Sequence, residues 1–181
     1  WYVEQYRILN DELGRTSDAY FRNAIIKNYT YKGPVLEWYM RIKCRIDGYY
    51  DLWDRLTPRN ATITDVGCGY GQMVFMLGLL SSKRTVLGID YDNDKIEIAQ
   101  NSFLCKKANV RFQCGDMCKV QIPKSDVILF NDSLHYVDKE SQESILERGI
   151  GSVTENGFIV VRDGDASRTE THNKIEQTEV W

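Results

Sequence analysis

The sequence predicts an α/β domain whose centre is a doubly wound parallel sheet. From residue 61 onward, short β-rich runs alternate with helix-like stretches, which is typical of a sheet covered by helices on both faces. A glycine-rich turn also directly follows the first β-rich run. The five strands are expected at residues 61–66, 84–90, 110–113, 126–131 and 158–162, and the helices between them at 72–80, 93–104 and 139–149. Right-handed crossovers then favour the strand order 3-2-1-4-5.

The first 60 residues predict a helical cap, and residues 61–181 a C-terminally short core. Polar residues 11–17 suit a break between two helices, and residues 57–60 suit a linker. One long helix is expected over residues 34–56, with Pro34 in its first turn and Gly48 as a weak point. Its apolar stripe comprises Val35, Trp38, Tyr39, Ile42, Ile46, Tyr49, Trp53 and Leu56.

Composition narrows the class of protein. The chain has 181 residues and a net charge of −3, and its basic residues are spread out, so no nucleic-acid partner is expected. Five cysteines without paired spacing predict reduced thiols in the cytoplasm; Cys114 and Cys118 lack the second pair that a metal site needs. No apolar run approaches the roughly 18 residues of a membrane span, and no signal peptide is recognisable. The absence of an initial methionine suggests a piece of something longer.

The turn after the first strand is the most informative motif. Glycines stand at Gly67, Gly69 and Gly71, with Cys68 between the first two. Glycines let the backbone turn sharply and approach a ligand closely, but a bare glycine-rich loop is weak evidence by itself. The spacing is GxGxG, not the dinucleotide GxGxxG, and Asp65 would repel a pyrophosphate. The loop therefore favours a cationic ligand.

Two further acidic strand ends fit the same ligand. Asp90, followed by Tyr91, ends the second strand, where a carboxylate can accept hydrogen bonds from both ribose hydroxyls. Gly115, Asp116 and Met117 follow the third strand, where the acid can accept a bond from an adenine amino group and the methionine can back the ring. Each of these is an ordinary strand end or turn when taken alone.

As a set, these motifs resemble class I S-adenosylmethionine-dependent methyltransferases, over residues 61–165. The resemblance implies a Rossmann-like transferase that binds S-adenosylmethionine and releases S-adenosylhomocysteine. It carries cofactor contacts over to Asp65, Gly67, Cys68, Gly69, Gly71, Asp90, Tyr91, Gly115, Asp116, Met117 and Asn131. The family sheet normally has seven strands. Residues 169–181 read as polar or helical, so the last two strands are expected to be missing or supplied by another chain, and an open sheet edge favours a homo-oligomer.

Residues 29–39, 134–136 and 162–165 show a narrower resemblance. They are similar to the methyltransferase segment of bacterial fusion proteins in which an MMPL-type transporter and a lysophospholipid acyltransferase-like segment precede it. That resemblance implies a cytoplasmic domain tethered at the inner face of a membrane, and a lipid-like acceptor as an alternative to another small molecule.

The loop after the fourth strand is expected to hold the reacting end. His135 can act as the base for a hydroxyl acceptor and Asp132 can orient it, although a loop histidine can equally well only pack or cap a helix. Asp163 and Asp165 suggest a Mg²⁺ site, but two acids around a glycine more often mark a turn, so no metal is expected.

Aromatic residues of the N-terminal part allow two interpretations. Tyr29, Tyr31, Trp38 and Tyr39 can form a lid over the cofactor or acceptor, or they can simply pack a helix on the sheet.

Rival functions remain open at this point. They are a dinucleotide-dependent oxidoreductase, a non-catalytic adenosylmethionine-binding module, and a regulatory partner of a second subunit.

Overall fold

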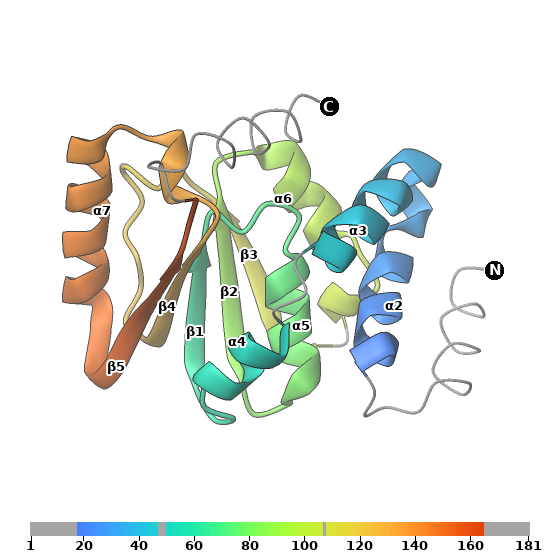
Figure 1. Cartoon of the computed structure of the whole chain (residues 1–181), viewed down its shortest axis with the longest axis horizontal. Helices are drawn as coiled ribbons and strands as arrows, with labels where there is room; N and C mark the ends of the chain where they lie inside the picture. Colours follow the sequence, from blue (N-terminus) through green and yellow to red (C-terminus); the bar gives the residue numbers. More distant parts are fainter. Residues whose placement is uncertain (1–17, 47–49, 107, 165–181) are drawn as a thin grey trace.

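The sheet is parallel and five-stranded in the computed structural model, which describes residues 18–46, 50–106 and 108–164 (Figure 1). Its order is β3-β2-β1-β4-β5, so the predicted order is confirmed. All neighbouring strands run in the same direction. The strands are β1 (Thr62–Val66), β2 (Thr85–Asp90), β3 (Val110–Cys114), β4 (Ser125–Asn131) and β5 (Val153–Arg162).

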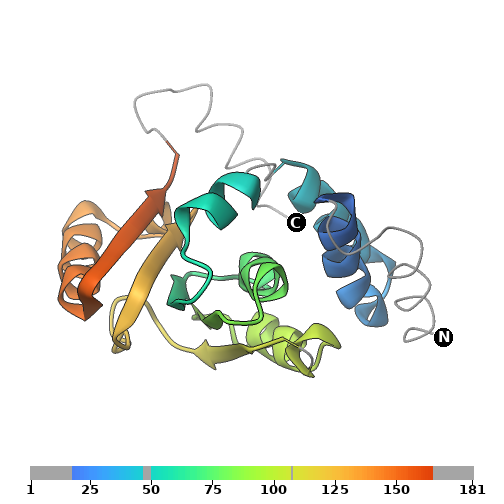
Figure 2. The same cartoon turned by 90° about the horizontal axis from the view of Figure 1, so that it is seen from below.

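Helices lie on both sides of the sheet, but unequally. Phe75 and Ile96 bring α5 and α6 onto one face, with α2 and α3 outside them, while Ile145 of α7 packs on the other face at β4 (Figure 2). Short 3-10 turns connect several elements. The helices and turns are α2 (Asp18–Asn28), η1 (Thr30–Lys32), α3 (Pro34–Ile46), α4 (Tyr50–Leu56), α5 (Gln72–Leu80), α6 (Asn93–Gln100), η2 (Leu104–Lys106), η3 (Leu134–Tyr136) and α7 (Lys139–Ser152).

The helix predicted over residues 34–56 is helical in both of its described parts. The structure has α3 and α4 there, while residues 47–49, including Gly48, lie outside the described residues. The part of the expected apolar stripe that lies on α3 is exposed. Val35 is 83% exposed and Trp38 65%, whereas Met40 and Cys44 are buried. Periodicity identifies an apolar face, but it does not say that the face meets the sheet. Residues 11–17 and 169–181 likewise lie outside the described part.

The N-terminal helices share one core with the sheet. Ile25 of α2, Met40 of α3 and Trp53 of α4 belong to the same buried cluster as Ile63 and Val86 of the sheet. The division into a cap at 1–60 and a core at 61–181 stays a prediction, because a common cluster neither requires nor excludes it.

Arg84 joins α4 to the sheet from inside the core. Its side chain is fully buried, and it donates to Asp54 Oδ1 at 2.7 Å, to the Thr57 carbonyl at 2.6 Å and to the Pro58 carbonyl at 3.0 Å. A buried guanidinium is tolerated only when its donors are satisfied. The end of α4 and the segment after it supply these acceptors, so Arg84 fixes the course of the chain into β1.

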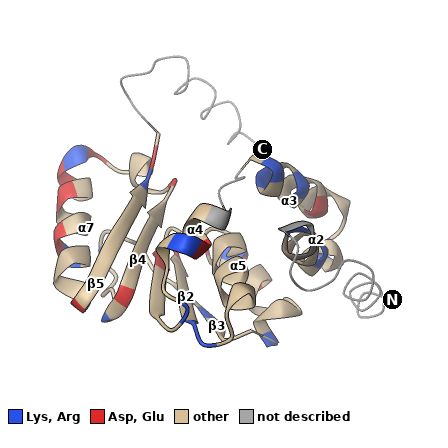
Figure 3. Cartoon of the chain, turned by 60° about the horizontal axis from the view of Figure 1, so that its bottom comes forward, with Lys and Arg blue, Asp and Glu red and all other residues tan. Residues whose placement is uncertain are grey.

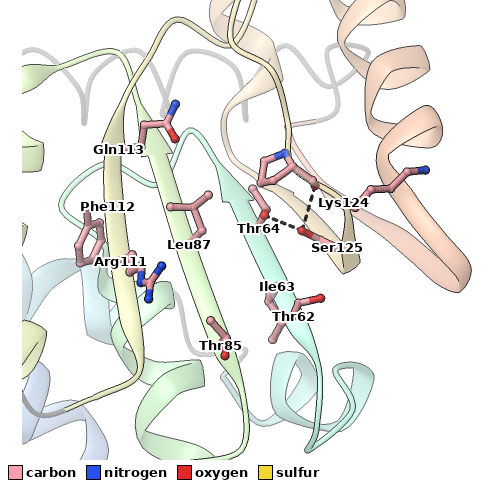
Figure 4. Close-up of a pocket in the computed structure, with 11 residues that line it drawn as sticks. Thr62, Ile63, Thr64, Thr85, Leu87, Arg111, Phe112, Gln113, Lys124 and Ser125 are labelled. Carbon is pink, nitrogen blue, oxygen red and sulfur yellow. Dashed lines mark hydrogen bonds between the residues drawn. The ribbon is translucent and has the colours of Figure 1, made fainter.

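A shallow groove lies on the face of the sheet opposite α5, where no described helix covers β1 to β3 (Figure 4). It has a volume of about 530 Å³. Threonines 62, 64 and 85 line it together with Leu87 and Arg111, and none of the predicted cofactor residues does. The groove is therefore separate from the cofactor site that the sequence motifs predict.

Basic residues are dispersed over the described surface, and the described helices are short. Lys and Arg residues are spread over α3, α4 and the ends of the sheet in the view of Figure 3, with no basic face gathered there. Among the helices of the described part, none has the length and apolar character needed to cross a membrane.

We expect Arg84→Met to destabilise the fold by about 3 kcal/mol, because it leaves buried carbonyl groups without a donor. Arg59→Met is the matched control. Arg59 also binds Asp54, at 2.6 Å, but its side chain is 62% exposed, so its loss should cost no more than about 1 kcal/mol. Urea unfolding of both variants measures the difference, and equal losses would contradict the role of Arg84.

Candidate functional site

The glycine-rich loop follows β1 and is fastened to β2. The amides of Gly67 and Cys68 both donate to the Ile89 carbonyl, at 2.8 and 3.0 Å. Gly67, Gly69 and Gly71 have φ angles of 83°, 55° and 80°. This left-handed region suits glycine and strains other residues. The sequence therefore needs glycines here so that the chain can turn from the sheet into α5.

Two of these glycines also lie where no side chain fits. A Cβ on Gly67 would lie 2.3 Å from the Ser133 Cβ, and one on Gly71 would lie 2.2 Å from the Phe112 ring. A Cβ on Gly69 would have no described atom within 4 Å beyond its chain neighbours. Ser133 belongs to the loop after β4 and donates to the Val66 carbonyl at 2.9 Å. The loop that carries His135 therefore rests directly on the glycine-rich loop.

Asp90 closes the glycine-rich loop from the end of β2. Its Oδ2 accepts from the Gly69 amide at 2.7 Å, and its Oδ1 accepts from the Asp92 amide at 3.0 Å. Sequence reasoning expected Asp90 to meet ribose hydroxyls and missed this structural role. Each carboxylate oxygen keeps a second lone pair, so both roles are chemically compatible.

Asp65 is a buried carboxylate at the sheet end of the loop. It is 2% exposed, and its Oδ1 has no hydrogen-bond partner within the described part of the chain. Burial raises the pKa of Asp65 to about 7, and the nearby Asp90 carboxylate adds to the rise. A buried acceptor without a partner is costly unless a ligand satisfies it. A cationic group in this position would supply the missing partner.

The remaining predicted contacts divide between buried and exposed positions. Cys68 is buried, and burial raises the pKa of its thiol well above the usual value; its contact with the cofactor stays a prediction. Met117 places its Cε 3.5 Å from the position of a Gly67 Cβ. Gly115 donates from its amide to the Asp90 carbonyl at 2.8 Å, which holds the third strand end against the second. Tyr91, by contrast, is 69% exposed.

Asp116 lies in an exposed turn. Its Oδ1 accepts from the Cys118 amide at 2.8 Å, and its Oδ2 lies 3.1 Å from Lys119 Nζ. The Cys118 amide, followed by the Lys119 ammonium, lowers the pKa of Asp116. Its contact with an adenine ring stays a prediction.

The carboxylate beside His135 in the structure is not the one predicted from the sequence. Asp132 has a left-handed backbone, with φ at 52°, and its Oδ2 lies 2.5 Å from Arg162 Nη1. The same nitrogen donates to Asn131 Oδ1 at 3.1 Å. His135 Nδ1 instead lies 2.6 Å from Asp163 Oδ1. Asp132 therefore does not orient the ring, because its carboxylate is held by Arg162 of the neighbouring strand.

Asp163 was considered from the sequence only as a turn or metal residue. Its useful signal was its place directly after the fifth strand, which pairs with β4. Asp165 lies outside the described residues. Within the described residues, no three His, Cys, Asp or Glu side chains are grouped as a metal site would require.

The aromatic residues are arranged behind and beside the loop. Tyr29 is fully buried, and its hydroxyl donates to the Tyr70 carbonyl. The rings of Tyr29 and Tyr70 pack edge-on, with their centroids 6.3 Å apart. Tyr39 of α3 meets Tyr70 at 5.7 Å from another side. Tyr31 donates to the Ile98 carbonyl at 2.6 Å. Tyr29 thus supports the loop from within the core, while Tyr39 and Trp38 belong to the exposed side of α3.

Sheet order, glycine-rich loop and buried acids together define the class I fold of S-adenosylmethionine-dependent methyltransferases. The methyltransferase domain family matches residues 63–157, and the chain belongs to this family. The residues fit the cofactor, since the unsatisfied Asp65 oxygen offers a site for its positive charge.

Known proteins of related sequence are distant. A carboxy-S-adenosyl-L-methionine synthase of Campylobacter concisus is 20% identical over 79% of this chain and 64% of its own length. That of Helicobacter hepaticus is 25% identical over 62% of this chain and 46% of its own. The chain thus spans about half to two thirds of these relatives.

Solved structures share the fold. The PH0226 protein of Pyrococcus horikoshii superposes with a TM-score of 0.63 at 19% identity, covering 96% of this chain and 71% of that one. PKMT2 of Rickettsia typhi, solved in complex with AdoHcy, has a TM-score of 0.51 at 25% identity, covering 57% of this chain and 21% of that one.

We expect Gly71→Ala to cost about 2–4 kcal/mol of stability, from the left-handed backbone together with overpacking against Phe112. Gly69→Ala, which adds only the backbone strain, should cost about 1–2 kcal/mol. Thermal and urea unfolding of the two variants provide the comparison. A larger loss for Gly69→Ala would show that the loop is not packed against β3 as described.

Proposed function

We propose that this chain transfers the methyl group of S-adenosylmethionine to a hydroxyl of a small-molecule or lipid-like acceptor, and that His135 takes the hydroxyl proton. The observation that carries the proposal is the contact between the two loops: Ser133 touches Gly67, so His135 is held close to the cofactor loop. Bound S-adenosylmethionine supplies an electrophilic methyl group on a sulfonium. The chain's own part is to orient the acceptor and to remove its proton.

The cofactor contacts predicted from the sequence form the first half of the proposal. Asp65 would bind the positively charged group of the cofactor. Asp90 would accept hydrogen bonds from its ribose hydroxyls, and Met117 would pack against its adenine ring. The loop glycines admit the ligand close to the backbone. The burial of Asp65 and Asp90, at 2% and 7% exposure, supports a site in which these groups are partly desolvated and therefore interact strongly with a bound cation.

The exposed side of α3 favours an apolar acceptor. Val35, Trp38 and Ile42 are exposed and share one side of the helix, and Tyr39 beside them touches Tyr70 of the cofactor loop. Contiguous exposed apolar residues next to a ligand site often bind an apolar partner. An aromatic or acyl group of the acceptor would cover them.

A second candidate follows from the curated relatives, which are named carboxy-S-adenosyl-L-methionine synthases. In that case the bound S-adenosylmethionine would itself be altered and would not give up its methyl group. Mass spectrometry of the nucleoside product separates the two functions, because only methyl transfer yields S-adenosylhomocysteine.

Binding of S-adenosylmethionine should depend on pH through Asp65. Below pH 7 the free protein holds a proton on this carboxyl, which must leave before a cation can bind. The association constant should therefore fall by up to about tenfold for each pH unit between 7 and 5.5. Calorimetric titration measures this dependence.

Asp65→Asn is the control for that titration. It should bind the cofactor weakly and with little pH dependence over the same range, since the amide does not titrate there. An equal pH dependence in both proteins would exclude Asp65. No binding of S-adenosylmethionine by the intact chain, together with binding of NAD, would favour a dinucleotide-dependent enzyme instead.

Replacing the proposed base should affect turnover and not cofactor binding. With long-chain alcohols, phenols and sugars offered as acceptors, we expect His135→Gln to lower kcat for S-adenosylhomocysteine release by about 10²–10⁴-fold, at unchanged cofactor affinity. Glu140→Gln, an exposed change at the start of α7, is the control and should leave kcat unchanged. Unaltered turnover in His135→Gln would remove the base. Cofactor binding without turnover on any acceptor would favour a non-catalytic binding module.

A further inference from the structure

The carboxylate of Asp163 forms hydrogen bonds with the η3 turn. Its Oδ2 accepts from the backbone amides of Leu134 and His135, at 2.8 and 3.2 Å. Its Oδ1 accepts from the Gly164 amide at 2.8 Å and lies 2.6 Å from His135 Nδ1. The side chains of Asp163 and His135 are only 17% and 21% exposed. The pair is therefore largely shielded from water and held by several bonds at once.

These contacts decide which ring nitrogen carries the proton. An ionised carboxylate only accepts hydrogen bonds, and the close partner of Oδ1 is a ring nitrogen that either donates or accepts. Only a protonated Nδ1 satisfies both atoms. The lone pair of the neutral ring then lies on Nε2.

We propose that Asp163 is a positioning residue that fixes the tautomer of His135, with the proton on Nδ1 and Nε2 as the nitrogen that accepts the proton of the acceptor hydroxyl. This inference rests on the proposed function. As the bond from the acceptor oxygen to the methyl carbon forms and the bond from sulfur to that carbon breaks, the hydroxyl proton passes to Nε2. The imidazolium so formed faces the Asp163 carboxylate, which stabilises its charge.

The substitution Asp163→Asn should reverse the tautomer. If the amide oxygen replaces Oδ2, it keeps the bonds to Leu134 and His135, and the amide NH₂ faces Nδ1 and Gly164. The opposite orientation would set the NH₂ against the two part-buried amides of η3 and lose both bonds. The first orientation loses only the exposed Gly164 bond, so it is favoured. An NH₂ group facing Nδ1 requires a lone pair there, which moves the ring proton to Nε2.

The test is long-range ¹H–¹⁵N correlation NMR of the chain labelled with ¹⁵N-histidine, at a pH where the ring is neutral. The chain contains only His135 and His172, so a His172→Gln variant assigns both sets of signals. We expect the proton on Nδ1 in the unaltered chain and on Nε2 in Asp163→Asn. Asp132→Asn is the matched control: asparagine tolerates a left-handed backbone, and Asp132 binds Arg162, so the His135 tautomer should not change.

Each result bears on the proposal. A proton on Nε2 in the unaltered chain overturns it, even if Asp163→Asn does not fold. An unchanged tautomer in Asp163→Asn, or a changed one in Asp132→Asn, overturns it as well. The measurement needs neither cofactor nor acceptor. The tautomer therefore stands or falls separately from methyl transfer, whose own failure appears as unaltered turnover in His135→Gln.

Discussion

Three backbone amides fasten the glycine-rich loop to β2, and the rest of the site depends on this attachment. Gly67 and Cys68 bind the Ile89 carbonyl, and Gly69 binds the Asp90 carboxylate. Because hydrogen bonds between buried groups are expensive to break, the loop is held in one conformation before any ligand arrives. That conformation brings Tyr70 against Tyr29, which follows α2, and against Tyr39 of α3. It also leaves room at Gly67 for the loop that carries His135. A single short turn thus sets the relative position of both halves of the site.

The N-terminal segments are bonded to the glycine-rich loop and to the sheet. Tyr29 buries its ring behind the loop, and its hydroxyl donates to the Tyr70 carbonyl. Arg84, directly before β2, donates to the Thr57 carbonyl and so holds the segment after α4. Both residues join segments that are far apart in sequence. The helices therefore contribute to the rigidity of the loop as well as to the apolar core.

The sequence was sufficient for the fold because parallel strands buried on a shared core show as short apolar runs, and the crossover rule then leaves few orders. It located the glycine-rich loop and its acids for a similar reason, since those residue types are required by backbone geometry and by charge. It failed for the partner of His135. Asp132 is nearer in sequence, but its left-handed backbone and the register of Asn131 with Arg162 turn it toward Arg162, and neither can be read from residue types. For α3, periodicity identified the helix and its apolar side, but it could not show what lies opposite that side.

On the face of β1 and β2 that no helix of the described residues covers, the residue types have a consequence for contact with other chains. An apolar sheet face without a covering helix would attract other chains and promote aggregation. Here much of that face consists of threonines, which favour extended backbone through their branched Cβ yet present a hydroxyl. Thr62, Thr64 and Thr85 use these hydroxyls for bonds to Asp126, Ser125 and Asn109. Substituting valines at these positions would keep the strands, but it would remove these hydroxyl bonds and make this face of the sheet more apolar.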